Sequence, residues 1–144
     1  MQPFIRSLAI CVFRHDDKIL VFEGYDPSKN QVFHRPLGGG IEAGEYAKDA
    51  IVREIREELG AEITNVRLIG TLESIFTFNC RPGHEIVMVY DAEFVDRSLY
   101  DKDKFDVVEE VETIRAMWKS LNDFCKADAP PLYPDGLFDL LVRS

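Results

Sequence analysis

Three glutamates in the middle of the chain have the spacing of a metal-binding site. Glu54, Glu57 and Glu58 stand at i, i+3 and i+4, so on a helix their side chains share one arc of the surface. Like charges at this spacing destabilise a helix by roughly 0.2–0.5 kcal/mol per pair, and a bound divalent cation would reverse that effect. Oxygen ligands without histidine or cysteine favour Mg²⁺ or Mn²⁺ over zinc. The pattern therefore predicts a site for a hard divalent cation.

A run of three glycines, Gly38-Gly39-Gly40, precedes these glutamates. Without a Cβ atom, backbone amides and carbonyls can approach a metal ion or a phosphate closely. We expect the run to form an irregular loop that leads toward the helix and shares one site with the carboxylates. Taken separately, each feature is also typical of a solvated helix face or an ordinary turn.

The helix that carries the glutamates is predicted over residues 46–59. Ala47, Ile51, Ile55 and Leu59 recur every four residues, which is the spacing of one buried face, and Gly60 is suited to end the helix. Around it, apolar runs and turn residues predict strands, a hairpin turn containing Pro82 and Gly83, and two short helices near the end. The predicted strands cover 4–14, 18–22, 31–35, 66–78, 84–95 and 111–118, a loop covers 23–30, and the late helices cover 120–126 and 135–142.

Length and composition favour one folded domain over residues 1–144. The chain of 144 residues is 46% hydrophobic and 11% aromatic, which is enough apolar material for a core without a disulfide or metal staple. Strands on both sides of one strong helix predict an α/β fold in which helices cover a mixed sheet.

The charge and the cysteines exclude several classes of function. With 17 basic and 26 acidic residues the net charge is −9, and no basic stripe marks a binding face for a nucleic acid polymer. Cys11, Cys80 and Cys125 lie far apart without zinc-site spacing, which is typical of a reduced, cytoplasmic protein. The apolar runs are far shorter than the roughly 20 residues of a membrane helix, so no membrane partner is expected.

The glycines, glutamates and arginine together form a longer motif. Residues 39–61 read GGIEAGEYAKDAIVREIREELGA, and this segment resembles the Nudix box of the Nudix hydrolases (MutT-like). The matching fixed positions are Gly39, Glu45, Arg53, Glu54, Glu57, Glu58 and Gly60. Ala61 departs from the pattern, because the family prefers a larger aliphatic residue there. The order of predicted strands and Trp118 extend the resemblance over the whole chain.

The resemblance implies a Nudix α/β/α sandwich and an Mg²⁺-dependent phosphoric anhydride hydrolase, with Mn²⁺ as a substitute. Its substrate would be a small molecule in which a nucleoside diphosphate is linked to another group, and water would attack a phosphorus to release two phosphorylated products. Many relatives are dimers, so the resemblance is compatible with a homodimer. The resemblance also assigns roles. Metal ligands would be Glu54, Glu57, Glu58 and the Gly38 carbonyl, Glu54 could instead act as general base, and Arg53 and Glu45 would support the carboxylates.

Other residues are weaker candidates. Relatives often take a base from a glutamate in a loop before the late tryptophan, and of Glu109, Glu110 and Glu112 we favour Glu112 from its distance to Trp118. Arg35, Gly39 and Gly40 are expected to contact substrate phosphates. Phe76, Phe78 and Tyr90 are expected in the core instead of in a base-stacking surface.

Two questions stay open at this level. A non-catalytic Nudix scaffold that binds a nucleotide or a protein is the alternative to an enzyme, although the intact Arg53-Glu54 and Glu57-Glu58 set argues against it. The substrate is also open among oxidised or ordinary nucleoside triphosphates, nucleotide sugars and related diphosphates, because loops set the specificity.

Overall fold

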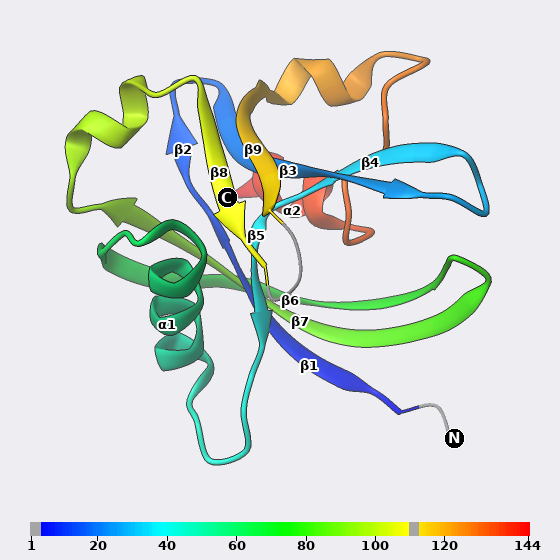
Figure 1. The fold of residues 1–144 in the computed structure, drawn as a ribbon, viewed down its shortest axis with the longest axis horizontal. Helices are drawn as coiled ribbons and strands as arrows, with labels where there is room; N and C mark the ends of the chain where they lie inside the picture. The colour runs from blue at the N-terminus through cyan, green and yellow to red at the C-terminus, as the bar shows by residue number, and fades with distance from the viewer. Residues whose placement is uncertain (1–3, 110–112) are drawn as a thin grey trace.

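The computed structural model describes residues 4–109 and 113–144 (Figure 1). Its elements are, in chain order, β1 (Arg6–Val12), β2 (Arg14–His15), β3 (Lys18–Asp26), β4 (Gln31–Arg35), β5 (Leu37–Gly40), α1 (Ala47–Leu59), β6 (Ile63–Phe78), β7 (Arg81–Phe94), η1 (Arg97–Asp101), β8 (Lys104–Val108), β9 (Thr113–Ser120), η2 (Leu121–Cys125) and α2 (Leu137–Arg143).

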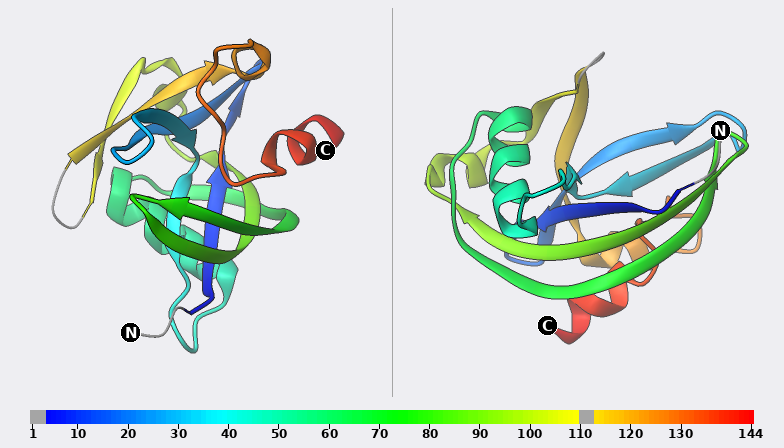
Figure 2. Two further views of the ribbon diagram at one scale, coloured as in Figure 1. Left: turned by 90° about the vertical axis from the view of Figure 1, so that its right-hand side faces the viewer. Right: turned by 90° about the horizontal axis from the view of Figure 1, so that it is seen from below.

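A mixed sheet with the order β5-β1-β7-β6 forms the centre of the fold. Strand β1 runs parallel to β7 and antiparallel to β5. Alternate side chains of β1 enter two different cores: Ala9 and Cys11 pack with α1, whereas Ile10 and Val12 pack with α2. The sheet therefore has a helix on each face (Figure 2), and the predicted α/β/α arrangement is confirmed.

A second sheet is antiparallel throughout and was not separated from the first by the sequence. Its order is β2-β3-β9-β8, with β4 paired to β3. Residues 23–26, predicted as loop, continue β3 because they pair with β4, from Glu23 opposite His34 to Asp26 opposite Gln31. Pairing with a neighbouring strand has overridden the local loop composition.

The glycine run is a strand, so the predicted irregular loop is wrong. Gly38, Gly39 and Gly40 pair with Ile10, Ala9 and Leu8 of β1. Gly38 has φ 152°, and a Cβ atom there would lie 2.1 Å from the carbonyl oxygen of Ala9. The glycines are needed because two backbones approach closely, not because the chain turns.

Helix α1 agrees with its prediction apart from one residue at its start. It begins at Ala47, and Ala50, Ile51 and Ile55 form its buried face. Gly60 ends it in the left-handed region at φ 66°, where its N–H donates to the carbonyl of Arg56. The buried face fixes the helix on the mixed sheet and directs its acidic face toward β5.

The long β6–β7 hairpin turns earlier than predicted. Asn79 and Cys80, at φ 51° and 66°, form the turn, as a two-residue hairpin requires. Pro82 and Gly83 pair within β7, where Gly83 lies opposite Phe76. A Cβ atom on Gly83 would come within 2.4 Å of the Phe76 ring, so this glycine makes room for an aromatic side chain.

The late helices occur close to their predicted places. Ser120 caps η2 by accepting the N–H of Asn122, although η2 is a 3₁₀ helix and ends at Cys125. Leu137 and Leu141 of α2 are buried against the mixed sheet. No helix among residues 4–109 and 113–144 is long and apolar enough to span a membrane.

Candidate active site

The acidic face of α1 opens into a cleft of about 850 Å³. The glycine strand β5 forms one wall, and α1 and the end of β8 form others. The predicted site residues that line it are Gly38, Gly39, Gly40, Arg53, Glu54, Glu57, Glu58 and Glu109. Helical spacing and the antiparallel pairing of β5 therefore bring the glutamates and the glycines together, as the sequence predicted.

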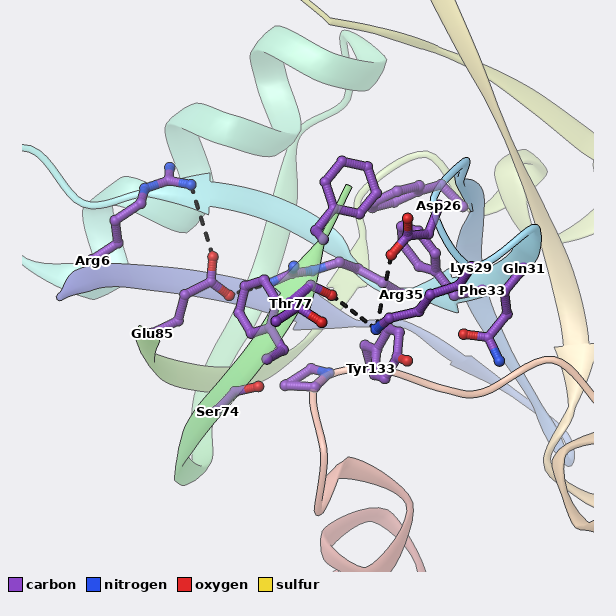
Figure 3. A pocket seen from close by; sticks show the side chains of 14 residues that line it. Arg6, Asp26, Lys29, Gln31, Phe33, Arg35, Ser74, Thr77, Glu85 and Tyr133 are labelled. Atoms are coloured by element: carbon purple, nitrogen blue, oxygen red, sulfur yellow. Dashed lines mark hydrogen bonds and ion pairs between the residues drawn. The ribbon is translucent and has the colours of Figure 1, made fainter. Parts of the chain in front are cut away.

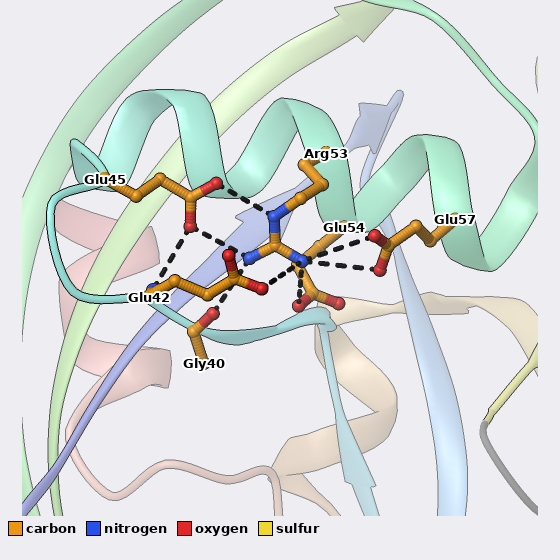
Figure 4. A network of polar contacts seen from close by, with 6 residues as sticks. All are labelled: Gly40, Glu42, Glu45, Arg53, Glu54 and Glu57. Atoms are coloured by element: carbon orange, nitrogen blue, oxygen red, sulfur yellow. Dashed lines mark hydrogen bonds and ion pairs between the residues drawn. The ribbon is translucent and has the colours of Figure 1, made fainter.

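Arg53 is the centre of the polar network in this cleft (Figure 4). Its Nε and Nη2 atoms donate to the two oxygens of Glu45 at 2.8 and 2.9 Å. Nη2 also donates to the carbonyl of Gly40 at 3.1 Å, and Nη1 donates to Glu54 at 3.1 Å and Glu57 at 3.3 Å. One guanidinium thus joins the helix, the loop before it and the glycine strand. This geometry fits the supporting role expected for Arg53 and Glu45.

Arg53 and Glu45 also shift one another's proton affinity. The hydrogen bonds from Arg53 lower the pKa of Glu45, and the same contacts raise the pKa of Arg53. Both groups are therefore charged near neutral pH, and the pair stays intact there.

Glu58 is the most buried carboxylate of the cleft. The residue is only 5% exposed, and its Oε1 atom has no hydrogen-bond partner among the described residues. Burial, with the negative charges of Glu109 and Glu54, raises its pKa to about 9. A buried carboxylate that lacks a cation takes up a proton, and a divalent ion would replace that proton.

Glu54 lies directly against the glycine strand. A Cβ atom on Gly39 would come within 2.6 Å of the Glu54 carboxylate carbon, so only glycine leaves this carboxylate its place. Burial is the main cause of the raised pKa of Glu54, and hydrogen bonding to Arg53 partly opposes it. The position explains why the motif requires glycine at this point.

The residues present fit a hard divalent cation. Glu58 offers a buried oxygen that has no partner in the described part of the chain, Glu54 lies beside it, and all of the candidate ligand atoms are oxygens. Within residues 4–109 and 113–144, no three acidic, histidine or cysteine side chains are already gathered at metal-binding spacing. The Glu57 carboxylate is 57% exposed and is paired with Arg53. Metal binding would draw Glu57 away from that pair.

The structure brings Glu109 to the site. Its carboxylate faces Glu58 closely enough to raise the pKa of Glu58, and it lines the cleft at the end of β8. Glu110 and Glu112 lie outside the described residues, so the choice of Glu112 stays a prediction.

An aromatic pocket of about 290 Å³ adjoins the cleft (Figure 3). Phe22, Phe33 and Phe78 line both. Phe33 packs edge-on against Phe78, with 6.0 Å between ring centroids, and its ring is tilted against that of Tyr133 at 5.5 Å. The expectation that Phe76 and Phe78 belong to the core is wrong, since both line this pocket, whereas Tyr90 is buried.

Sequence reasoning missed the pocket because distant segments build it. Phe76 and Phe78 alternate along β6, a signal that places both on one face. Tyr133 arrives from the C-terminal segment, which hydrogen-bonds to His34 of β4 through the backbones of Pro131 and Tyr133. The sequence near Tyr133 contains no signal that predicts this contact.

Arg35 lies in the aromatic pocket at the end of β4. Its Nη2 atom donates to the Glu85 carboxylate at 3.3 Å. Arg35 lines a smaller pocket together with Gly38 and Gly39, so it lies next to the glycine strand, as expected. Its acidic partner Glu85 was not predicted from the sequence.

Comparison with known proteins places this geometry in a family. A family profile described as "NUDIX domain" matches residues 3–136. The uncharacterized Nudix hydrolase YvcI of Bacillus subtilis is 31% identical over 144 residues, which cover 99% of this chain and 83% of YvcI. The NAD-capped RNA hydrolase NudC of Pseudomonas aeruginosa is 30% identical over 81% of this chain, but the match spans only 36% of NudC.

Solved structures share the fold. The MutT NUDIX hydrolase from Burkholderia pseudomallei superposes with a TM-score of 0.67 at 22% identity, covering 96% of this chain and 97% of that one. A NUDIX hydrolase from Nitrosomonas europaea gives 0.67 at 21% identity, with coverage of 99% and 87%. The profile match and the relative of similar length agree with the motif: the chain belongs to the Nudix hydrolase family.

Proposed function

We propose that this chain is a divalent-metal-dependent pyrophosphohydrolase of a nucleoside diphosphate linked to another group. The observation that carries the proposal is the shared cleft, in which Glu54, Glu57, Glu58 and Glu109 face the glycine strand and an aromatic pocket adjoins them. A carboxylate cluster suits a cation that holds a diphosphate, and an aromatic pocket suits a flat ring.

In this proposal Glu57, Glu58, Glu54 and the Gly38 carbonyl would hold Mg²⁺, or Mn²⁺ in its place. The ion, when bound, would supply charge neutralisation for the diphosphate and activation of water. Arg53 keeps Glu54 and Glu45 oriented. Water attacks a phosphorus, its proton passes to a carboxylate of the cleft, and the bridging P–O bond breaks so that the leaving oxygen departs on the second product.

Glu54 and Glu109 are the described candidates for the group that accepts this proton, and Glu112 is the third. Replacing each by glutamine separates their roles. The base is the residue whose loss lowers kcat and removes the acidic limb of the pH–rate profile. A ligand is the residue whose loss raises the Mg²⁺ concentration needed for half-maximal rate.

The substrate is best sought with a panel of small nucleotides. It contains ordinary and oxidised nucleoside triphosphates, nucleotide sugars and NAD, with Mg²⁺ or Mn²⁺ at mildly alkaline pH. A NAD-capped RNA is included because several relatives are named for that reaction. The net charge of −9 supports a small substrate over a nucleic acid polymer. We propose that the protein acts in the cytoplasm, as a monomer or a homodimer.

Chromatographic detection of products, with hydrolysis repeated in ¹⁸O-labelled water, tests the proposal. We expect two phosphorylated products from one compound, with the label on the attacked phosphorus, and loss of turnover in Glu57→Gln. Glu62→Gln is the matched control, since Glu62 pairs with Arg56 at 2.7 Å outside the cleft. A folded, metal-binding protein that turns over no compound would favour the non-catalytic binding module instead.

A further inference from the structure

Glu85 is a buried acidic residue that the proposed reaction does not use. It lies on β7 and is 5% exposed. Strand pairing places it opposite Arg6 of β1 on one side and Ser74 of β6 on the other. An ionised carboxylate in this position requires cationic partners.

Two arginines from different strands meet this carboxylate. Arg35 of β4 approaches Oε1 at 3.3 Å, and Arg6 approaches Oε2 at 3.8 Å. Figure 3 shows the Arg6–Glu85 pair at one side of the aromatic pocket. Each carboxylate oxygen thus has one guanidinium as its ion-pair partner, and two arginines around one carboxylate leave the trio with a net positive charge. This trio is called the Arg6–Glu85–Arg35 clamp below.

The clamp lies where the aromatic pocket meets the glycine strand and the glutamates of the cleft. Its three residues line the aromatic pocket and also a smaller pocket with Gly38, Gly39 and Glu109. The Nη2 atom of Arg6 lies 3.5 Å from the position that a Cβ atom on Gly40 would occupy. A molecule with its ring among the aromatic side chains and its diphosphate at the carboxylates would pass this point.

We propose that Arg6 and Arg35 bind the phosphate that joins the substrate's nucleoside to the rest of its diphosphate, and that Glu85 is the residue that positions them. The inference rests on the proposed function for the identity of the substrate. A phosphate has three acceptor oxygens, and a guanidinium has five donors, so Arg35 and Arg6 can each bind Glu85 and a phosphate together.

The role of Glu85 is to limit the motion of the two arginines. A free arginine loses side-chain entropy when it binds an anion, and a guanidinium already held by a carboxylate loses less. The acidic partner also prevents two uncompensated positive charges from facing each other when no ligand is bound. The local charge stays positive, which attracts a phosphate into an otherwise acidic cleft.

Binding measurements test the clamp without hydrolysis. The probes are the 5′-monophosphates of the five common nucleosides, each compared with its own nucleoside by calorimetric titration in EDTA. The ratio of the two affinities isolates the contribution of the phosphate. The variants are Glu85→Gln, which keeps the shape of the side chain, and Arg6→Gln, whose side chain is 53% exposed and lies outside the core. Circular dichroism and urea unfolding check the fold of each.

Asp91→Asn is the matched control. Asp91 lies on the same strand, β7, and pairs with Arg67 of β6 at 2.8 Å, away from both pockets. The Asp91→Asn substitution therefore removes a carboxylate–arginine pair from the same sheet and leaves the residues of the clamp in place.

We expect at least one monophosphate to bind the wild type about 10- to 100-fold more tightly than its nucleoside, as one or two charge-assisted hydrogen bonds allow. Glu85→Gln and Arg6→Gln should lose most of this gain, and Asp91→Asn should keep it. Nucleoside affinity should stay unchanged in Asp91→Asn and should fall much less than nucleotide affinity in Glu85→Gln and Arg6→Gln, since both residues also line the aromatic pocket. With the substrate found by the panel, Glu85→Gln should raise KM by a similar factor and change kcat much less.

Several results would overturn the clamp. If Glu85→Gln binds the monophosphate as much more tightly than the nucleoside as the wild type does, Glu85 does not position the arginines. If the wild type binds the monophosphate no more tightly than the nucleoside, the arginines do not bind this phosphate, even if the protein hydrolyses a nucleotide. If the protein hydrolyses nothing but binds the monophosphate more tightly than the nucleoside, and this difference is lost in Glu85→Gln, the proposal for the clamp is supported and the proposed function is contradicted. Glu57→Gln separates the two claims, since it should abolish turnover and leave the phosphate gain intact.

Discussion

Replacing Arg53 by lysine should destabilise the fold although the charge is kept. Arg53 is 25% exposed, and its three nitrogens hold Glu45, Glu54 and the Gly40 carbonyl at once. A lysine ammonium is a single point that cannot reach all three. Loss of about two charge-assisted hydrogen bonds, discounted for partial exposure, predicts a loss of about 2 kcal/mol in the free energy of unfolding.

The chain contains a matched control on the same helix. Arg56 donates Nε and Nη2 to the two oxygens of Glu62 at 2.7 and 2.8 Å, which is the geometry of the Arg53–Glu45 pair. Both partners are more than half exposed, so water and salt screen the interaction. Arginine and lysine have similar helix propensities, and Arg56→Lys should leave stability unchanged.

Urea and thermal unfolding of the metal-free proteins measure the difference. We expect Tm to fall by about 7 °C in Arg53→Lys and to stay at the wild-type value in Arg56→Lys. Equal stability of the two variants would refute the reasoning, because it would mean that partial burial and the shared contacts of Arg53 add nothing to an ion pair of this shape.

Three further changes have defined outcomes. Gly39→Ala should lower kcat by about 100-fold in a folded protein, because its Cβ would displace the Glu54 carboxylate; an unchanged kcat contradicts this. The pKa of Glu58 is raised by burial to about 9, so the folded state binds a proton that the unfolded chain releases at lower pH. Metal-free stability should therefore fall as pH rises from about 5 to 9, and Mg²⁺ or Glu58→Gln should flatten the slope; a slope retained in Glu58→Gln assigns it to another group. Tyr133→Ala should raise KM about tenfold through lost ring contacts, whereas a fall in kcat alone would place Tyr133 outside substrate binding.

The sequence predicted the helix and its acidic face well because both depend on local spacing. Ile51 and Ile55 mark the buried side of α1, and the same periodicity puts Glu54, Glu57 and Glu58 on the side of the cleft. Gly60 ends the helix for a local backbone reason. Features that depend on a few neighbouring residues can be read from one chain.

The two misassigned loops have one physical origin, which is backbone pairing with another strand that the local composition does not show. The composition of Gly38 to Gly40 predicts a loop, but these residues pair with β1. The composition of residues 23–26 also predicts a loop, but these residues belong to β3 and pair with β4. The same holds for the site. Glu85 reads as one acid in a strand, and only the parallel pairing of β1 and β7 places Arg6 next to it.

The metal dependence of hydrolysis tests the central claim most directly. Mg²⁺ and Mn²⁺ should each be titrated into the wild type, Glu57→Gln and the control Glu62→Gln, with the hydrolysis rate followed for both ions and binding followed for Mn²⁺. We expect saturable turnover that coincides with cation binding, is abolished by EDTA and by Glu57→Gln, and is unchanged in Glu62→Gln. Turnover that persists in EDTA or in Glu57→Gln would contradict the central claim.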